Sequence, residues 1–161
     1  MNPLEIYPAT KKDIPVLFDL IKQLSEFEDL THELEATEAS LEAALFGEQP
    51  HAEVLLGYVN QVPVSYALFT YSFSTLLAKP GLYLVDLYVV SKFRKQGIGR
   101  AMLVYLAKLA KERNYGRVEW LVLNWNKSAI KLYENLGAEA LNEWIPYRLA
   151  GAALDDLAGQ N

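Results

Sequence analysis

The chain has 161 residues, of which 52% are hydrophobic and 22% are charged. This length and composition predict one globular domain over residues 1–161, because two domains would each have too small a core. The net charge of −5 argues against general nucleic-acid binding, which needs positive charge facing phosphates, and suits a cationic substrate.

The sequence has no cysteine, and its only histidines are His32 and His51. This composition excludes disulfides and a thiolate nucleophile, and it predicts no metal site. The first ten residues lack the basic start and apolar centre of a secretory signal. No apolar run reaches the about 18 residues that span a bilayer. We therefore expect a cytoplasmic protein without a membrane partner.

The first half of the chain switches between helical and strand periodicity. Thr10 and Asp13 form a helix N-cap pattern, and Asn60 and Gln61 separate two apolar runs as a tight antiparallel turn does. The predicted elements are a strand over 4–9, a helix from about 10 to 28, a helix from about 37 to 46, and strands over 52–59 and 62–73.

The second half alternates strands and helices. The predicted elements are a strand over 82–90, an amphipathic helix over about 97–112, a strand over 118–123, a helix over 126–137 and a last strand near 144–150. Antiparallel strands early and strand–helix alternation late predict a mixed α/β fold.

The segment RKQGIGR, residues 94–100, lies where the predicted strand 82–90 meets the helix that follows. Its glycines allow backbone close to a ligand, and the first N–H groups of a helix have no partners within the helix. Arg94, Lys95 and Arg100 add positive charge. The segment therefore predicts an anion site that suits a pyrophosphate.

Other phosphate-binding loops match this segment poorly. A Walker A loop needs lysine and then serine or threonine after its second glycine, but Gly99 is followed by Arg100 and Ala101. A Rossmann fingerprint needs a third glycine or alanine where Met102 stands, so a nucleotide- or NAD-binding protein is disfavoured. A basic helix start without a ligand stays an alternative.

A second motif, NWNKSAIKLYENLGA, places Tyr133 seven residues after Asn126. Together, RKQGIG after a strand and this Asn–Tyr pair resemble the acyl-CoA loop and the following motif of the GCN5-related N-acetyltransferase (GNAT) superfamily. The segments YPAT, LIKQLSEFEDL, FGEQP, LFTYSF and YLVDLYV are similar to its diamine and thialysine acetyltransferase branch. The resemblance implies a central mixed, mostly antiparallel sheet flanked by helices, and a homodimer.

The resemblance also implies acetyl-CoA as co-substrate, without a metal. Asn126 is implied as a side-chain contact to the pantetheine arm, and Tyr133 as the general acid that protonates the departing thiolate. A core tyrosine is the alternative for Tyr133. The backbone contacts to the arm would come from Leu87, Tyr88 and Val89, and the pyrophosphate site from Arg94, Lys95, Gln96, Gly97, Ile98, Gly99 and Arg100.

The acceptor amine must lose a proton before it attacks, so a carboxylate is expected nearby. Asp86, a lone acid in an apolar strand, is the first candidate, with a structural role as its alternative. Glu28, beside Phe27, matches a substrate-contacting glutamate of the diamine branch, although it also fits a solvated charge. Trp120 is a candidate for the wall of the acceptor pocket, although tryptophans are more often core residues.

Two departures from the polyamine pattern bear on the acceptor. Val85 and Ile145 stand where the resemblance places carboxylates, although Glu143 lies close to the second position. A shorter diamine or a lysine-like amino acid such as thialysine therefore fits better than a long polyamine, with direct attack in a ternary complex because no cysteine carries the acyl group. Two alternatives stay open: the acceptor is an amine of a protein or peptide, or the chain is a CoA-binding module without turnover. The presence of Tyr133 and Asn126 argues against the module.

Overall fold

The computed structural model describes residues 3–160 and divides into two compact units, one up to Leu121 and one from Val122 onward. The first unit contains β1 (Glu5–Pro8), α1 (Ile14–Phe27), α2 (Glu38–Phe46), β2 (Glu53–Val59), β3 (Val62–Ser74), β4 (Lys79–Val89), α3 (Ile98–Glu112) and β5 (Val118–Trp120), and the second contains α4 (Lys127–Asn135) and α5 (Gly151–Ala158).

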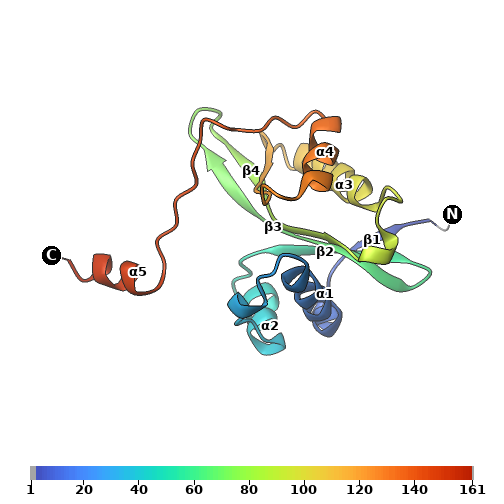
Figure 1. Ribbon diagram of the computed structural model, residues 1–161, viewed down its shortest axis with the longest axis horizontal. Coiled ribbons are helices and arrows are strands. Elements are labelled where there is room, and N and C mark those ends of the chain that lie inside the picture. Colours follow the sequence, from blue (N-terminus) through green and yellow to red (C-terminus); the bar gives the residue numbers. More distant parts are fainter. Residues whose placement is uncertain (1–2, 161) are drawn as a thin grey trace. The chain divides into compact units, whose positions relative to one another are not determined.

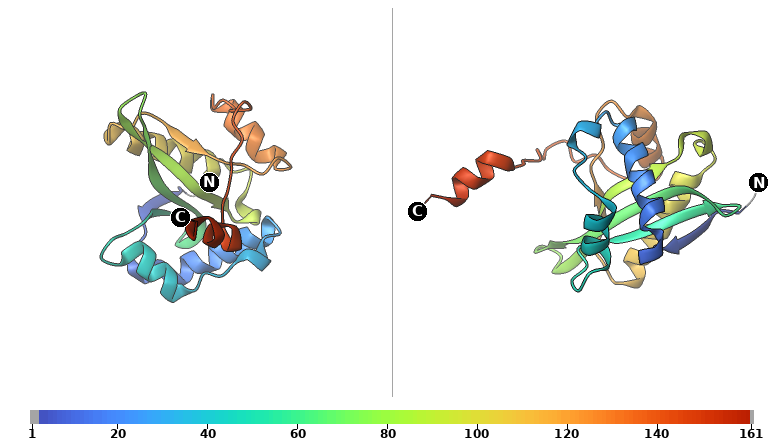
Figure 2. Two further views of the ribbon diagram at one scale, coloured as in Figure 1. Left: turned by 90° about the vertical axis from the view of Figure 1, so that its left-hand side faces the viewer. Right: turned by 90° about the horizontal axis from the view of Figure 1, so that it is seen from below.

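The first unit is built on one sheet with strand order β1-β2-β3-β4-β5. The three pairings from β1 to β4 are antiparallel, and β4 pairs with β5 in parallel. Helices α1 and α2 cover one face of the sheet and α3 covers the other (Figures 1 and 2). The predicted mixed, mostly antiparallel sheet flanked by helices is confirmed.

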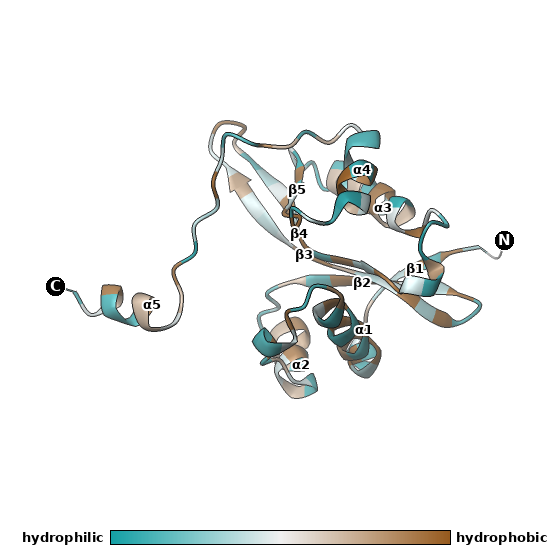
Figure 3. Cartoon of the chain, viewed as in Figure 1, coloured by the Kyte–Doolittle hydropathy of each residue, from teal (hydrophilic) through white to brown (hydrophobic). Residues whose placement is uncertain are grey.

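Helix α1 starts about four residues later than predicted, because Thr10 caps a 3-10 turn, Lys11–Asp13, that precedes the helix. The backbone N–H of Thr10 donates to the Asp13 carboxylate at 2.7 Å, which holds the chain at the helix start. Leu17, Leu20 and Leu24 recur at helical spacing, are buried, and pack against residues of β2, β3 and β4. The ribbons of α1 and α3 alternate between brown and teal, as expected for helices with one apolar face (Figure 3).

Helix α3 starts at a glycine with a left-handed backbone. Gly97 has φ of 82°, a conformation that costs other residues roughly 1–2 kcal/mol. From there Ile98, Met102, Leu106 and Ala110 recur every four residues and are buried. The glycine therefore turns the chain from the end of β4 into a helix whose apolar side lies on the sheet.

A β-bulge in β4 determines which face Asp86 occupies. Leu68 pairs with Asp86, and the next residue, Phe69, pairs with Leu84. Val85 is therefore the extra residue of the bulge and has no partner on β3. Paired residues share a face and successive residues of β3 face opposite sides. Leu84 and Asp86 therefore lie on opposite faces although they are two residues apart, and Asp86 faces α1.

The chain after β5 differs from the sequence prediction. The strand predicted over 118–123 ends at Trp120, and residues 144–150 form no strand in the described chain. The prediction of a last strand is therefore wrong for this structure: the β-rich composition of WIPYRLA has no partner strand there, and pairing decides strand formation more than composition does. Helix α5 was not predicted, although its alanines and leucines favour a helix.

Candidate active site

Asp86 lies in a half-buried setting on the α1 face of the sheet. The hydroxyl of Tyr66, on the neighbouring strand β3, donates a hydrogen bond of 3.1 Å to Oδ2 of Asp86. Burial raises the pKa of the Asp86 carboxyl, and the hydrogen bond from Tyr66 opposes that rise. Asp86 forms no ion pair with the described residues, so its charge is not neutralised by a cation.

Glu28 is a second carboxylate at this place. It follows the last residue of α1 and is half-buried. Its pKa is raised by burial and, to a smaller extent, by the negative charge of Asp86. The two acids form a local negative field, and a bound cation would relieve it.

Tyr88 completes the α1 side of this cluster. Its ring is buried, lies 6.4 Å from the ring of Tyr66, and its hydroxyl donates to Oε1 of Gln23 on α1 at 3.4 Å. The sequence analysis assigned Tyr88 a backbone role, and the structure adds that its side chain joins β4 to α1 beside the two acids.

Arg94 connects the cluster to the predicted anion loop. Its guanidinium lies over the ring of Phe27 at 4.1 Å and over the ring of Tyr88 at 5.5 Å, and its Nε donates to the carbonyl of Val89 at 2.9 Å. These contacts fix the loop against the end of α1 and the end of β4. Phe27, predicted as a substrate contact, thus packs on a residue of the predicted cofactor loop.

The edge of β4 is open beside the predicted arm site. The parallel pairing with β5 ends at Leu84 and Trp120, while β4 continues along β3 to Val89. In the described chain no strand pairs with Leu87, Tyr88 and Val89 on the β5 side. Unpaired strand edges present backbone N–H and C=O groups, which is what an amide-containing pantetheine arm would need.

The loop at the start of α3 has the features of an anion site. Lys95, Gln96 and Arg100 are exposed, and Gly97 brings the chain into the helix with no atom of the described chain near its would-be Cβ. The first amide groups of the helix point along its axis out of its N-terminus, where the helix dipole is positive. Ile98, in contrast, is buried and anchors the helix to the core.

The two predicted residues of the second unit both belong to α4. Asn126 is its N-cap, and its side-chain oxygen accepts from the N–H of Ala129 at 3.2 Å. Tyr133 lies seven residues later and is half-buried. Seven residues are two helical turns, so the two side chains share a face of α4.

The structure links five of the predicted side chains of the first unit and adds two residues that were not predicted. Glu28, Phe27, Asp86, Tyr88 and Arg94 are linked by the contacts above. Trp120 is not brought to them, because it pairs with Leu84 on the face of the sheet opposite to Asp86. Tyr66 and Gln23 were missed. A tyrosine in the buried strand VSYALF was the available signal for Tyr66, because a buried phenol usually has a hydrogen-bond partner.

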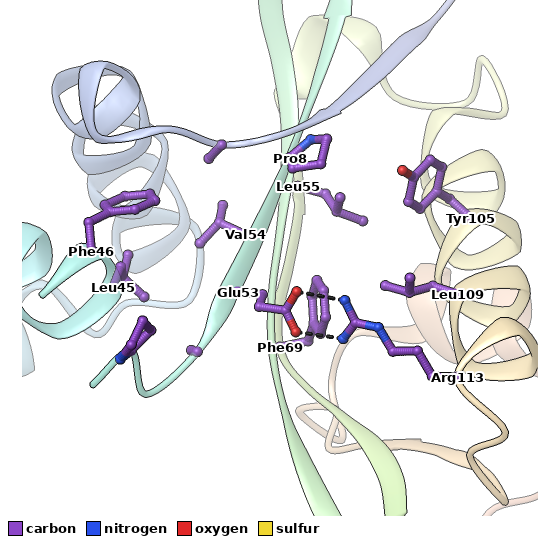
Figure 4. Close-up of a pocket in the computed structure, with 13 residues that line it drawn as sticks. Pro8, Leu45, Phe46, Glu53, Val54, Leu55, Phe69, Tyr105, Leu109 and Arg113 are labelled. Carbon is purple, nitrogen blue, oxygen red and sulfur yellow. Dashed lines mark hydrogen bonds and ion pairs between the residues drawn. The ribbon is translucent and has the colours of Figure 1, made fainter. Parts of the chain in front are cut away.

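A cavity of about 240 Å³ lies elsewhere in the first unit (Figure 4). Its wall includes the ion pair of Glu53 and Arg113, with two hydrogen bonds of 2.6 and 2.7 Å. Its apolar lining includes Leu45, Phe46, Val54, Phe69, Tyr105 and Leu109. No predicted site residue lines it, so this cavity is separate from the Asp86 cluster.

The residues that the structure describes offer neither a metal site nor a membrane-spanning helix. No group of three or more histidine, cysteine, aspartate or glutamate side chains is placed to hold a metal ion. None of the described helices combines the length and the apolar character that a membrane crossing requires.

Comparisons with known proteins define the class. Residues 17–138 match the Acetyltransferase (GNAT) family, and this match extends across the boundary between the two units. The chain therefore belongs to the GNAT acetyltransferase family and is an N-acetyltransferase. Acetyl-CoA is the co-substrate of GNAT acetyltransferases.

Individual relatives cover nearly the whole chain. A thialysine N-epsilon-acetyltransferase from Mus musculus is 33% identical over 99% of this chain and 100% of its own length. An L-ornithine N5-acetyltransferase from Arabidopsis thaliana is 31% identical over 91% of this chain and 84% of its own length. Among solved structures, an integron cassette protein from the mobile metagenome of V. cholerae aligns with a TM-score of 0.83 at 26% identity, covering 98% of each chain.

Proposed function

We propose that this enzyme acetylates the primary amine of a small molecule, either a lysine-like amino acid such as thialysine or ornithine, or a short diamine. The single observation that carries the proposal is the pair of carboxylates, Glu28 and Asp86, that share one partly buried site and form no ion pair with the described residues. The names of the similar thialysine and ornithine acetyltransferases support the same substrate class.

The two acids would have different roles toward the acceptor amine. Alkylamines with a pKa near 10 are protonated at neutral pH, so one carboxylate must accept a proton before the nitrogen attacks. We assign this step to Asp86, directly or through a water molecule. Glu28 would hold the substrate by a charge-assisted hydrogen bond, worth roughly 1.5–3 kcal/mol where water is excluded.

The donor would bind along the open edge of β4 and at the start of α3. The backbone of Leu87, Tyr88 and Val89 would hold the pantetheine arm, assisted by the side chain of Asn126. The pyrophosphate would be held by the segment from Arg94 to Arg100, with the exposed charges of Lys95 and Arg100 beside the α3 amides. Acetyl-CoA supplies an activated acetyl thioester.

Transfer would occur by direct attack in the ternary complex. The amine nitrogen forms a bond to the acetyl carbon as the carbon–sulfur bond breaks, and the proton of the ammonium has gone to Asp86. The departing thiolate takes a proton from the hydroxyl of Tyr133, the general acid of this proposal. The second proton that the nitrogen loses as the amide forms passes to solvent, from which the Tyr133 hydroxyl is restored. Support for Tyr133 comes from its spacing after Asn126 on α4.

The acceptor is expected to be short. Val85, at the bulge beside Asp86, is 50% exposed, and Ile145 is 72% exposed. The polyamine pattern has carboxylates at both positions, and their loss leaves fewer anions for a long polycation. Phe27, the last residue of α1, is proposed as a wall of the acceptor pocket. Trp120 pairs with Leu84, on the face of the sheet opposite to Asp86, and is not proposed for this pocket.

The test is release of CoA from acetyl-CoA with thialysine, ornithine, lysine, putrescine, spermidine and a lysine-containing peptide, measured for the wild type and Tyr133→Phe. We expect turnover with a small amine and a rate reduced by roughly 10²–10⁴ in Tyr133→Phe. Tyr71→Phe, which changes a tyrosine that is 72% exposed, is the matched control and should keep the wild-type rate. Binding of acetyl-CoA without turnover on any amine would favour a CoA-binding module instead.

The assembly and the location are separate proposals. A homodimer is implied by the similarity to the diamine branch, and light scattering should give a mass near twice the 18.2 kDa of the chain. A single domain over residues 1–161, a cytoplasmic location and the lack of nucleic-acid and membrane partners stay predictions from the sequence.

A further inference from the structure

Tyr66 is held in place by the core of the first unit. Its side chain is 0% exposed, and its ring belongs to the buried cluster that α1 forms with β2, β3 and β4. The ring of Tyr88 lies 6.4 Å away at an interplanar angle of 49°. A ring fixed by packing on all sides holds its hydroxyl at one point, and that point is 3.1 Å from Oδ2 of Asp86.

We propose that Tyr66 is a positioning residue for the transfer reaction: its hydroxyl holds Oδ2 of Asp86 and so leaves Oδ1 as the oxygen that receives the proton of the acceptor amine. This inference rests on the proposed role of Asp86 as the proton acceptor. Tyr66 itself need not touch either substrate, since it acts through the carboxylate.

The hydrogen bond from Tyr66 also favours the ionised form of Asp86. A carboxylate in a half-buried place has a raised pKa, and an acid that is already protonated cannot accept the proton of the amine. A donor to the ionised form counters this effect. The pKa of Tyr66 is itself raised far above its usual value by burial and by the charges of Asp86 and Glu28, so its hydroxyl remains a donor at every working pH.

The groups around this bond come from several elements. Glu28 contributes the second negative charge from the end of α1, and Gln23 of α1 accepts from Tyr88. Arg94 brings the positive charge from the loop before α3 and lies over the Tyr88 ring. Tyr66 differs from all of these because it is the group that donates directly to Asp86.

The test is Tyr66→Phe, which keeps the ring and removes only the hydroxyl. The pKa of the Asp86 carboxyl is measured by ¹³C NMR on protein labelled at aspartate carboxyls, with Asp86→Asn to assign the signal. We expect a higher pKa for Asp86 and an acid limb of the kcat/KM profile that moves to higher pH. On that limb kcat/KM should fall by roughly 3- to 10-fold, as expected for one hydrogen bond. Tyr58→Phe, a hydroxyl removed from β2 of the same sheet, should change neither quantity.

A second variant should change the Asp86 pKa in the opposite direction, and it keeps the test possible if Tyr66→Phe does not fold. Replacement of Tyr66 by 3-fluorotyrosine makes the hydroxyl a stronger donor, so the pKa of Asp86 should fall and the acid limb should move to lower pH. An Asp86 pKa that stays unchanged in these variants would overturn the inference. A pKa that shifts while the rate profile stays fixed would overturn the role of Asp86 as proton acceptor, and with it the catalytic role of Tyr66, but not the acetyltransferase activity.

Discussion

Two of the carboxylates on the sheet of the first unit, Asp86 on β4 and Glu53 on β2, have contrasting surroundings. Glu53 makes a two-point ion pair with Arg113 at the wall of the cavity in Figure 4, and the pKa of Arg113 is raised, chiefly by its hydrogen bond to Glu53. Asp86 has a neutral partner, the hydroxyl of Tyr66, and a second acid nearby.

These surroundings distinguish a structural carboxylate, Glu53, from a carboxylate that can accept a proton, Asp86. A guanidinium that binds both oxygens holds the carboxylate in one place and occupies both of its acceptor atoms. A carboxylate that is partly buried without a cation has a raised proton affinity and attracts a cationic ligand. The ion pair therefore predicts that Glu53 takes no part in catalysis, and the unpaired setting predicts that Asp86 transfers a proton.

The largest effect is expected for Asp86→Asn. The turnover number should fall by roughly 10²–10⁴, because the amide cannot accept the proton. Folding stability at pH 7 should not fall. A raised pKa gives a stabilising contribution that is present below the unfolded-state pKa and is lost as the pH rises through the folded-state value, and asparagine avoids that loss. Steady-state kinetics and thermal unfolding measure both quantities, and full activity in this variant would remove Asp86 from the mechanism.

Glu28→Gln should act mainly on acceptor binding. Loss of a charge-assisted hydrogen bond of roughly 1.5–3 kcal/mol corresponds to a KM for the amine that is roughly 10- to 100-fold higher, with a smaller change in kcat. Glu26→Gln, an exposed glutamate two residues earlier on α1, is the matched control. Equal effects of the two substitutions would indicate a general charge effect and contradict a specific contact of Glu28.

Gly97→Ala tests the loop that starts α3. A φ of 82° strains alanine by roughly 1–2 kcal/mol, so the backbone should shift and the KM for acetyl-CoA should rise about tenfold. Gly151→Ala, at another glycine with positive φ, introduces comparable strain at the start of α5 and should leave that KM unchanged. An unchanged KM in Gly97→Ala would argue against the pyrophosphate site proposed here.

The smallest effect is expected at the structural carboxylate. Glu53→Gln should lower the free energy of unfolding by about 0.5 kcal/mol, since both partners of its ion pair are partly exposed to solvent. Catalysis should stay at the wild-type level. Urea unfolding and CoA release measure the two quantities, and a loss of turnover comparable to that of Asp86→Asn would contradict the contrast between the two acids.

Much of the fold follows from local sequence signals. The capping pattern at Thr10, the apolar spacing of α1 and the turn at Asn60 and Gln61 were all read from neighbouring residues, and the structure has them where predicted. The strand predicted over 144–150 and the missed helix α5 show the limit, because a strand depends on a partner that lies far away in the sequence.

The candidate site was only partly predictable for the same reason. The sequence analysis singled out Asp86 as a lone acid in an apolar strand, but strict alternation would put its side chain on the same face as Leu84. The bulge at Val85 reverses that face and brings Asp86 to Tyr66 and α1. A bulge is a property of the pairing between β3 and β4, and the stacking of Arg94 on Phe27 joins residues that are farther apart still in the chain. The roles of Asn126 and Tyr133 stay predictions.

The most direct test of the central claim is a competition between acceptors. Limiting acetyl-CoA is added to the enzyme with equal concentrations of thialysine, ornithine, putrescine, spermidine and a lysine-containing peptide, and the acetylated products are identified by mass spectrometry. We predict that a singly acetylated amino acid or short diamine is the main product with the wild type and is nearly absent with Asp86→Asn. Acetylation of the peptide or spermidine alone, or equal product with both proteins, would contradict the proposed function.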